Sequence, residues 1–274
     1  MLAEIGRALL ASLGAFGYGG NTSRCHPHLA MASSRRTRPA AAPPAGPALA
    51  EKPHYHGHRE RLRERLLDAG AEALADYELL EFLLFDALAR GDTKPLAKAL
   101  IERFGSLAAV LGADKEALMD VRGMGAASAA RLLAVRSAGL RVLRAEVQRR
   151  PVIGSWQALI DYCTAAAGYA ANEEFRLLFL DKKNALIVDE QQQRGTVDHT
   201  PVYPREVVKR ALALGASAII MVHNHPSGDT TPSRADIDMT RIVAKALSAV
   251  GIALHDHVVI GRGRHSSFKT LGLL

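Results

Sequence analysis

The chain has few cysteines and no long apolar run, so it lacks the features of a disulfide-stabilised secreted domain and of a membrane-spanning protein. It has 274 residues and only two cysteines, Cys25 and Cys163, which lie far apart. Two distant cysteines provide neither a disulfide framework nor a metal-binding pair, and they indicate a reducing cytoplasm. The longest apolar run is too short and too interrupted for a transmembrane helix, so we expect no membrane association.

Positive charge exceeds negative charge but is not concentrated in one segment. Lys and Arg number 35 against 28 Asp and Glu, which gives a formal net charge of +7. Such a balance is compatible with contact to nucleic acid. Because arginine is spread along the chain, the charge alone does not indicate DNA binding.

The first fifty residues lack the composition of a folded domain. Residues 1–20 are apolar and rich in Gly and Ala, but they have neither the basic start nor a clear cleavage site of a signal peptide. Residues 33–53 are rich in Ser, Arg, Pro and Ala, and such a segment cannot bury a core. We therefore expect residues 1–52 to be disordered or a misannotated extension, with Met31 as an alternative start.

The rest of the chain predicts two domains that meet near residue 150. Residues 53–148 carry apolar residues at helical spacing between glycines, and they predict an all-helical domain. Residues 151–274 mix helical and strand patterns, and they predict an α/β domain. The predicted helices of the first domain span residues 59–68, 76–89, 94–104, 106–111 and 115–120, followed by a long helix that ends near residue 147.

A short glycine segment, Val-Arg-Gly-Met-Gly at residues 121–125, lies between two of these helices. It resembles a helix-hairpin-helix, in which the turn and the next helix offer backbone N–H groups to a DNA phosphate without reading bases. A tight turn between helices also needs glycine and is an equal alternative. Arg122 and Arg131 favour phosphate contact, so Arg122, Gly123 and Gly125 are the candidate residues for non-specific DNA binding.

The second domain predicts one sheet with helices around it. The final segment, residues 267–274, is expected to close an edge of this sheet. The predicted helices span residues 155–167, 205–214 and 233–249, and the predicted strands span residues 175–180, 185–190, 216–222 and 255–260, with a turn at 181–184 and an extended segment at 194–197.

The most informative segment begins with His223-Asn-His225, directly after the predicted buried strand 216–222. Side chains alternate along a strand, so His223 and His225 face the same side. After a loop, Ser233 is a good N-cap for the next helix, and Asp236 in its first turn can point back to the histidines. Two imidazoles and one carboxylate suit Zn²⁺, and three protein ligands leave the fourth position open, as in catalytic sites.

Each half of this segment also has a plainer interpretation. His-x-His can occur on a surface without a ligand, and Ser-x-x-Asp can be a capping box whose aspartate answers the helix dipole. Strand, loop and helix occur in the order that a metal site needs, and this combination favours the metal. Asp229 and Asp238 are rival carboxylates, but the first-turn position favours Asp236.

His-x-His, seven residues, Ser, two residues and Asp form the signature of the JAMM (MPN+) metalloproteases. The longer run from His223 to Asp229, with Tyr-Pro-Arg-Glu-Val at 203–207 before it and Asp-His-Val-Val-Ile-Gly at 256–261 after it, resembles the bacterial RadC-like branch. The resemblance extends from about residue 53 to the C-terminus. It implies a JAMM/MPN-type mixed sheet flanked by helices, a preceding helical domain and a zinc-dependent hydrolase.

The resemblance also implies a glutamate general base at the start of an upstream strand. Glu173 and Glu174 precede the predicted strand 175–180. Glu174 is the first choice because it directly precedes the strand, and Glu173 is the alternative if the register differs by one residue. Glu206 is a third candidate, with a role at its helix dipole as the plainer interpretation. Ser233 is implied as a hydrogen-bond donor to the oxyanion, besides its role as N-cap.

Asp256 and His257 lie in the predicted strand 255–260. Asp256 could hold a metal-binding histidine in one tautomer, but a strand residue with its own hydrogen-bond partners is the favoured interpretation.

Two classes of function follow from these residues. The first is a zinc metallopeptidase or isopeptidase that acts on a protein or peptide, with non-specific DNA contact through the helical domain. The second is a non-catalytic DNA-binding or repair accessory protein that uses the MPN fold as a scaffold. The complete set of ligand, base and oxyanion candidates favours the hydrolase. The sequence indicates neither the substrate nor the oligomeric state.

Overall fold

A computed structural model describes residues 57–88, 91–149, 151–194 and 202–274. The chain divides into two compact units, one ending at Glu72 and the other running from Ala73 to Leu274. The predicted disorder of residues 1–52 lies outside the described residues, and the predicted domain division near residue 150 stays a prediction. In the described ranges, no helix is long and apolar enough to cross a membrane.

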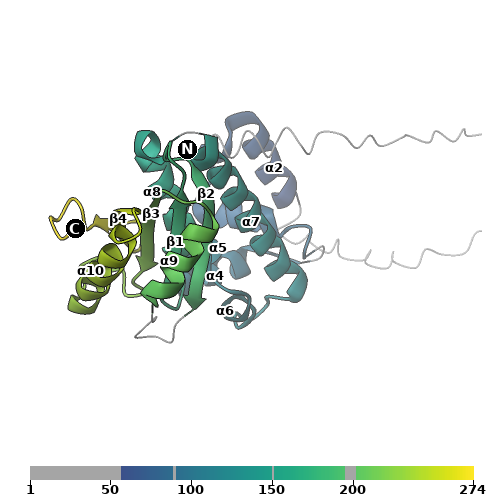
Figure 1. The fold of residues 1–274 in the computed structure, drawn as a ribbon. Coiled ribbons are helices and arrows are strands. Elements are labelled where there is room, and N and C mark those ends of the chain that lie inside the picture. Colours follow the sequence, from purple (N-terminus) through teal and green to yellow (C-terminus); the bar gives the residue numbers. More distant parts are fainter. Residues whose placement is uncertain (1–56, 89–90, 150, 195–201) are drawn as a thin grey trace, which may run out of the picture. The chain divides into compact units, whose positions relative to one another are not determined.

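The N-terminal part of the described chain is helical, as predicted (Figure 1). Local signals set the helix ends: Ser106 and Asp114 accept hydrogen bonds from backbone N–H groups in the first turns of α5 and α6, and Gly105, with φ of 89°, ends α4. The third helix ends at Leu84, earlier than predicted, because the chain turns there. The helices are α2 (His58–Ala69), η1 (Ala71–Ala73), α3 (Asp76–Leu84), α4 (Lys94–Phe104), α5 (Leu107–Gly112), α6 (Lys115–Met119) and α7 (Ala126–Arg149).

A five-stranded mixed sheet forms the C-terminal part, in the order β2-β1-β3-β4-β5. Among the strands of the described residues, β3 and β4 pair in parallel and the other neighbours pair antiparallel. This arrangement confirms the predicted α/β class. The elements are η2 (Val152–Ser155), α8 (Trp156–Ala167), β1 (Glu174–Leu180), β2 (Leu186–Arg194), α9 (Pro204–Ala213), β3 (Ala218–Asn224), α10 (Arg234–Ser248), β4 (Ala253–Ile260) and β5 (His265–Ser267).

Three boundaries differ from the prediction in ways that matter for the site. β3 continues to Asn224, so His223 lies inside the strand rather than after it. β2 continues to Arg194, which includes the start of the predicted extended segment; residues 195–197 lie outside the described residues. The edge next to β4 is formed by His265–Ser267, and the residues after Ser267 form turns instead of extending the edge.

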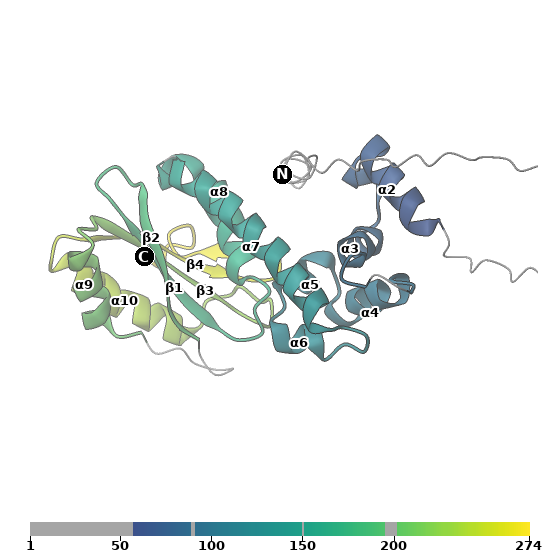
Figure 2. The ribbon, with the colours of Figure 1, turned by 90° about the vertical axis from the view of Figure 1, so that its right-hand side faces the viewer.

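Helix α8 covers one face of the sheet and helices α9 and α10 cover the other (Figure 2), with an apolar core on each side. On one face α8 packs over Leu178 and Leu180 of β1. On the other face α9 and α10 pack over Phe175, Leu177 and Phe179 of the same strand. The alternation of β1 therefore assigns each of its side chains to one face, as the pleat requires. On β3, His223 follows Ile219 and Met221 at two-residue spacing, which places it on the face of α9 and α10.

Candidate metal centre

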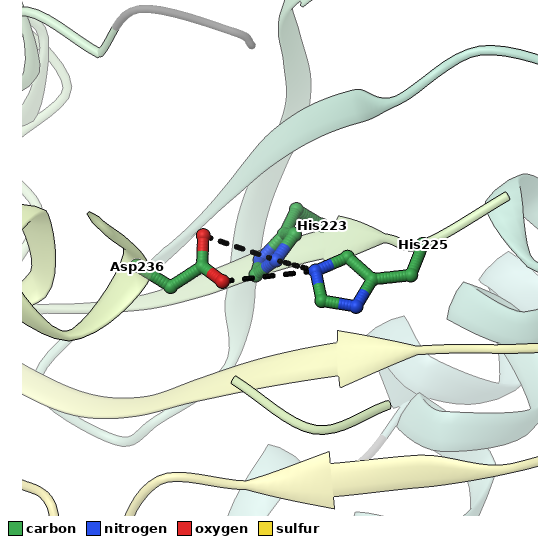
Figure 3. A group of neighbouring side chains, drawn as sticks. All are labelled: His223, His225 and Asp236. Carbon is green, nitrogen blue, oxygen red and sulfur yellow. Dashed lines mark hydrogen bonds and ion pairs between the residues drawn. The ribbon is translucent and has the colours of Figure 1, made fainter. Parts of the chain in front are cut away.

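Two histidines and an aspartate converge at the C-terminal end of β3 (Figure 3). Their ligand atoms lie within 4.8 Å of one another, and the group comprises His223, His225 and Asp236. The Nε2 atoms of the histidines are 3.0 Å apart. Oδ1 of Asp236 lies 3.5 Å from Nε2 of His223, and Oδ2 lies 3.7 Å from Nε2 of His225.

These distances fit a tetrahedral zinc site. Zinc binds histidine nitrogen and carboxylate oxygen at about 2.0 to 2.2 Å, so neighbouring ligand atoms at the tetrahedral angle lie about 3.3 to 3.6 Å apart. The two histidine nitrogens are 3.0 Å apart, and two different oxygens of Asp236 lie 3.5 and 3.7 Å from them, so these separations are close to that range. His223 is 1 % exposed, whereas His225 and Asp236 are partly exposed, so the group is anchored in the core and open on one side.

Both histidines are held through the ring nitrogen that faces away from the group. Nδ1 of His225 lies 2.6 Å from the backbone carbonyl of Asp229, so this nitrogen donates and Nε2 keeps its lone pair. The backbone N–H of His225 bonds to the carbonyl of Ile260, which fixes the chain just after β3. Nδ1 of His223 lies 2.7 Å from Nε2 of His257. A hydrogen bond on the far nitrogen is the usual way in which proteins orient a metal-binding imidazole.

Asp236 lies in the first turn of α10 and completes a capping box with Ser233. Its Oδ2 accepts from the backbone N–H of Ser233 at 2.7 Å, and the Ser233 hydroxyl accepts from the backbone N–H of Asp236 at 3.1 Å. Burial alone raises the pKa of Asp236, but its contacts with His223 and His225 outweigh this and lower the pKa far below its usual range. The contact with Asp236 is also the main reason why the pKa of His225 is raised. Asp236 forms the predicted capping box, and its position beside both histidines is compatible with the predicted ligand role.

The rival carboxylates are engaged elsewhere. Oδ1 of Asp229 accepts from the backbone N–H and the hydroxyl of Thr231, and Asp229 contributes its backbone carbonyl to His225 instead. Asp238 is exposed and lies 3.9 Å from Arg234 and 3.8 Å from Arg241. Neither carboxylate joins the group.

Ser233 is exposed beside the group at the start of α10. Its oxygen uses a lone pair to accept the bond from Asp236, so the hydroxyl hydrogen is available to donate. The placement is compatible with both predicted roles of Ser233.

The structure does not bring Glu174 to the group. Glu174 shares the α8 face of β1 with Arg176, whose guanidinium lies 3.8 Å from its carboxylate. Arg176 in turn bonds Asp189 at 2.7 Å, and Asp189 also accepts from Tyr162 of α8. The register explains this placement, because Phe175 pairs with His223, and the residues on either side of Phe175 point to the opposite face.

The strand register favours Glu173, the predicted alternative, over Glu174 as the candidate base. The printed strand pairing ends at Phe175 and His223; continued by two residues, the same antiparallel register places Glu173 opposite His225, on the metal face. Consistent with this placement, the Glu173 carboxylate contributes to the raised pKa of His225. Glu206 is exposed in the first turn of α9, 3.2 Å from Arg205 and 4.0 Å from Lys209, which matches its plainer interpretation.

Asn224, between the two histidines, is a site residue that the sequence interpretation missed. It is fully buried and points to the opposite face from His223. Its Oδ1 accepts from the backbone N–H of Glu174 at 2.7 Å, and its Nδ2 donates to the carbonyl of Asn172 at 3.1 Å. Asn224 thus clamps the backbone on both sides of Glu173. An amide inside a buried apolar strand was the available signal, since such a group needs partners.

Two family models match this chain. The RadC-like JAB domain matches residues 153–273, and the UPF0758 N-terminal domain matches residues 56–130. The chain belongs to the RadC family of JAB/MPN proteins. The predicted resemblance is therefore confirmed, and so is the order of a helical region followed by a JAB-type α/β sheet. The RadC-like match includes His223, His225, Asp236 and Ser233 together with both upstream glutamates.

In this RadC-family chain, the glycine segment 121–125 joins α6 to α7. Gly123 has a φ of +96°, and the N–H of Met124 bonds to the carbonyl of Val121. This geometry fits a helix-hairpin-helix and a simple turn equally well. Arg131 is paired with Asp86 at 2.8 Å, which weakens its support for phosphate contact. DNA binding by Arg122, Gly123 and Gly125 stays a prediction.

Proposed function

We propose that this RadC-family chain is a zinc-dependent amide hydrolase that acts on a protein or peptide. The single observation that supports this most is the convergence of His223, His225 and Asp236 at separations that suit a tetrahedral ion. When bound, zinc supplies a Lewis acid that acidifies water and polarises a carbonyl. Three protein ligands would leave the fourth coordination position open for water or substrate, as in other catalytic zinc sites.

The residues around the ligands divide the remaining work. Glu173, on the metal face next to His225, accepts the proton of the attacking water and passes it to the leaving amine. The Ser233 hydroxyl donates a hydrogen bond to the developing oxyanion. Asn224 holds the backbone around Glu173 so that the carboxylate stays near the reacting atoms.

A pocket of about 380 Å³ is lined in part by residues that neighbour the site in sequence. Pro226, which follows His225, lines one part of it, and Ala170 and Ala171, which lead to Glu173, line another. Its wall also includes Arg103 and Arg262. Because Pro226 directly follows His225, we expect this pocket to take a side chain of the polypeptide substrate.

The test is the metal content of the purified full chain. We expect one zinc ion per wild-type chain and essentially none in the variant His223→Ala plus His225→Ala, measured by elemental mass spectrometry. Asp238→Asn is the matched control, because this exposed carboxylate lies on the same helix outside the group, and it should keep its zinc. A wild-type chain that takes up no zinc, or a double variant that retains it, would remove the hydrolase proposal.

A second candidate function is non-specific DNA contact by the segment 121–125. This candidate rests on the glycine turn that precedes α7, in which Gly123 is left-handed, taken together with the net charge of +7. We expect Gly123→Ala plus Gly125→Ala to weaken binding to random duplex DNA in a gel shift, because the turn no longer presents its N–H groups. Arg131→Ala, at a residue already paired with Asp86, is the control. Equal DNA affinity of the double variant and the wild type would contradict this role.

A further inference from the structure

A continuous line of buried hydrogen bonds connects two of the proposed zinc ligands. Nδ1 of His223 lies 2.7 Å from Nε2 of His257, and Nδ1 of His257 lies 2.6 Å from the hydroxyl of Thr240. That hydroxyl lies 2.5 Å from the backbone carbonyl of Asp236. His223, His257 and Thr240 are each at most 1 % exposed.

The chemistry of its end points gives this line a single direction. A carbonyl oxygen can only accept, so the Thr240 hydroxyl donates to Asp236. The Thr240 oxygen must then accept from Nδ1–H of His257, which leaves Nε2 of a neutral His257 as an acceptor. Nδ1 of His223 therefore donates, and Nε2 of His223 carries the lone pair that faces Asp236 and His225.

The surroundings keep the His257 ring in place. His257 is fully buried, so its hydrogen bonds with His223 and Thr240 face no competition from water. Phe268 stacks on the ring at a centroid distance of 4.4 Å, and Phe175 contacts it edge-on at 5.9 Å. With the ring plane held on both sides, its nitrogens stay aimed at His223 and Thr240.

We propose that His257 and Thr240 are positioning residues that fix His223 in the tautomer needed to bind zinc through Nε2. This inference rests on the proposed zinc site. Helix α10 would then have two roles. It supplies the Asp236 carboxylate, and through Thr240 and His257 it determines which ring nitrogen of His223 carries the proton. A neutral imidazole, unlike the carboxylate that often orients a metal-binding histidine, adds no charge to the site.

The first test compares Thr240→Val with Thr240→Ser in the full chain. Valine removes the hydroxyl at almost constant volume, whereas serine keeps it. Zinc dissociation constants are measured by competition with a chelating dye. We expect Thr240→Val to weaken zinc binding about 10-fold to 100-fold, the range found when the partner of a metal-binding histidine is lost. Thr240→Ser should stay within about threefold of the wild type, because its hydroxyl can still donate to the carbonyl of Asp236 and accept from Nδ1 of His257.

The second test reads the tautomer directly in the metal-free wild type by long-range ¹H–¹⁵N correlation of the histidine rings. We expect the proton of His257 on Nδ1 and that of His223 on Nδ1. A proton on Nε2 of His257 would overturn the proposed positioning role of His257 and Thr240. Equal zinc affinity of the valine and serine variants would also overturn it. A wild type that binds no zinc removes the proposed hydrolase instead, and the tautomer spectrum still decides the positioning role. The spectrum also decides it if Thr240→Val does not fold.

Discussion

Glu173→Gln is expected to abolish amide hydrolysis while the chain keeps its full complement of zinc. Glutamine is close in shape to glutamate but cannot take a proton from water, and loss of a general base typically lowers the rate about 100-fold to 10,000-fold. Zinc should remain because the ligands are His223, His225 and Asp236, and Glu173 is not among them. The measurement is turnover of a fluorogenic peptide, selected from a random library for cleavage by the wild type, alongside zinc content.

Glu174→Gln is the matched control, since it makes the same change one residue away. Glu174 faces α8 and lies beside Arg176, so its loss should lower stability somewhat and leave turnover within about threefold of the wild type, as expected for a group away from the chemistry. The reverse result, with Glu174→Gln inactive and Glu173→Gln active, would return the base to Glu174. A zinc-loaded wild type that cleaves no member of the library would favour the scaffold alternative.

The fold and the ligand set could be predicted because their signals are local. His223, His225, Ser233 and Asp236 lie within fourteen residues, and the strand, loop and helix that carry them each have their own sequence signal. The loop between β3 and α10 brings the proposed ligands together, so their grouping does not depend on how the other strands pair. Helix starts such as Ser106 and Asp114 were readable for the same reason.

The base could not be assigned with the same security because it depends on strand register. Glu173 and Glu174 differ by one residue, and one residue in a strand exchanges the two faces of the sheet. The face is fixed by pairing with a strand some fifty residues further on, where Phe175 meets His223. In addition, β1 begins at Glu174, one residue earlier than predicted, so closeness to the strand start did not indicate the metal face.

The residues that support the site were missed because their roles exist only in contacts between distant segments. Asn224 reaches back to Asn172 and Glu174, and His257 links α10 to β3. Their types gave a hint, since a buried amide or imidazole requires partners. Which partner each one takes is a property of the assembled sheet, as Asp256 shows.

Asp256→Ala is expected to lower the free energy of unfolding by about 3 kcal/mol, the cost of leaving several buried donors without an acceptor. The sequence favoured a strand residue with its own hydrogen-bond partners at Asp256 over a role in holding a histidine tautomer, and the carboxylate does find its partners, mainly in the C-terminal turn. Oδ2 accepts from the hydroxyl of Ser267 at 2.5 Å, and Oδ1 accepts from the backbone N–H groups of His257 and Lys269 at 2.8 and 3.0 Å. Phe268, between the two turn residues, is fully buried.

Asp256→Asn should cost less than Asp256→Ala, because an amide oxygen can keep both backbone bonds. Asp238→Ala, at an exposed carboxylate, should change stability by no more than about 0.5 kcal/mol. Urea unfolding of the metal-free proteins measures all three. A loss below about 1 kcal/mol in Asp256→Ala would contradict a stabilising role for the hydrogen bonds of Asp256 to the C-terminal turn. The hydrogen bonds of Asp256 to Ser267 and Lys269 hold Phe268 against the ring of His257. Asp256→Ala should therefore also weaken zinc binding, whereas Asp238→Ala should not. Asp256 would then influence the proposed site through the packing of His257, without contacting a ligand side chain.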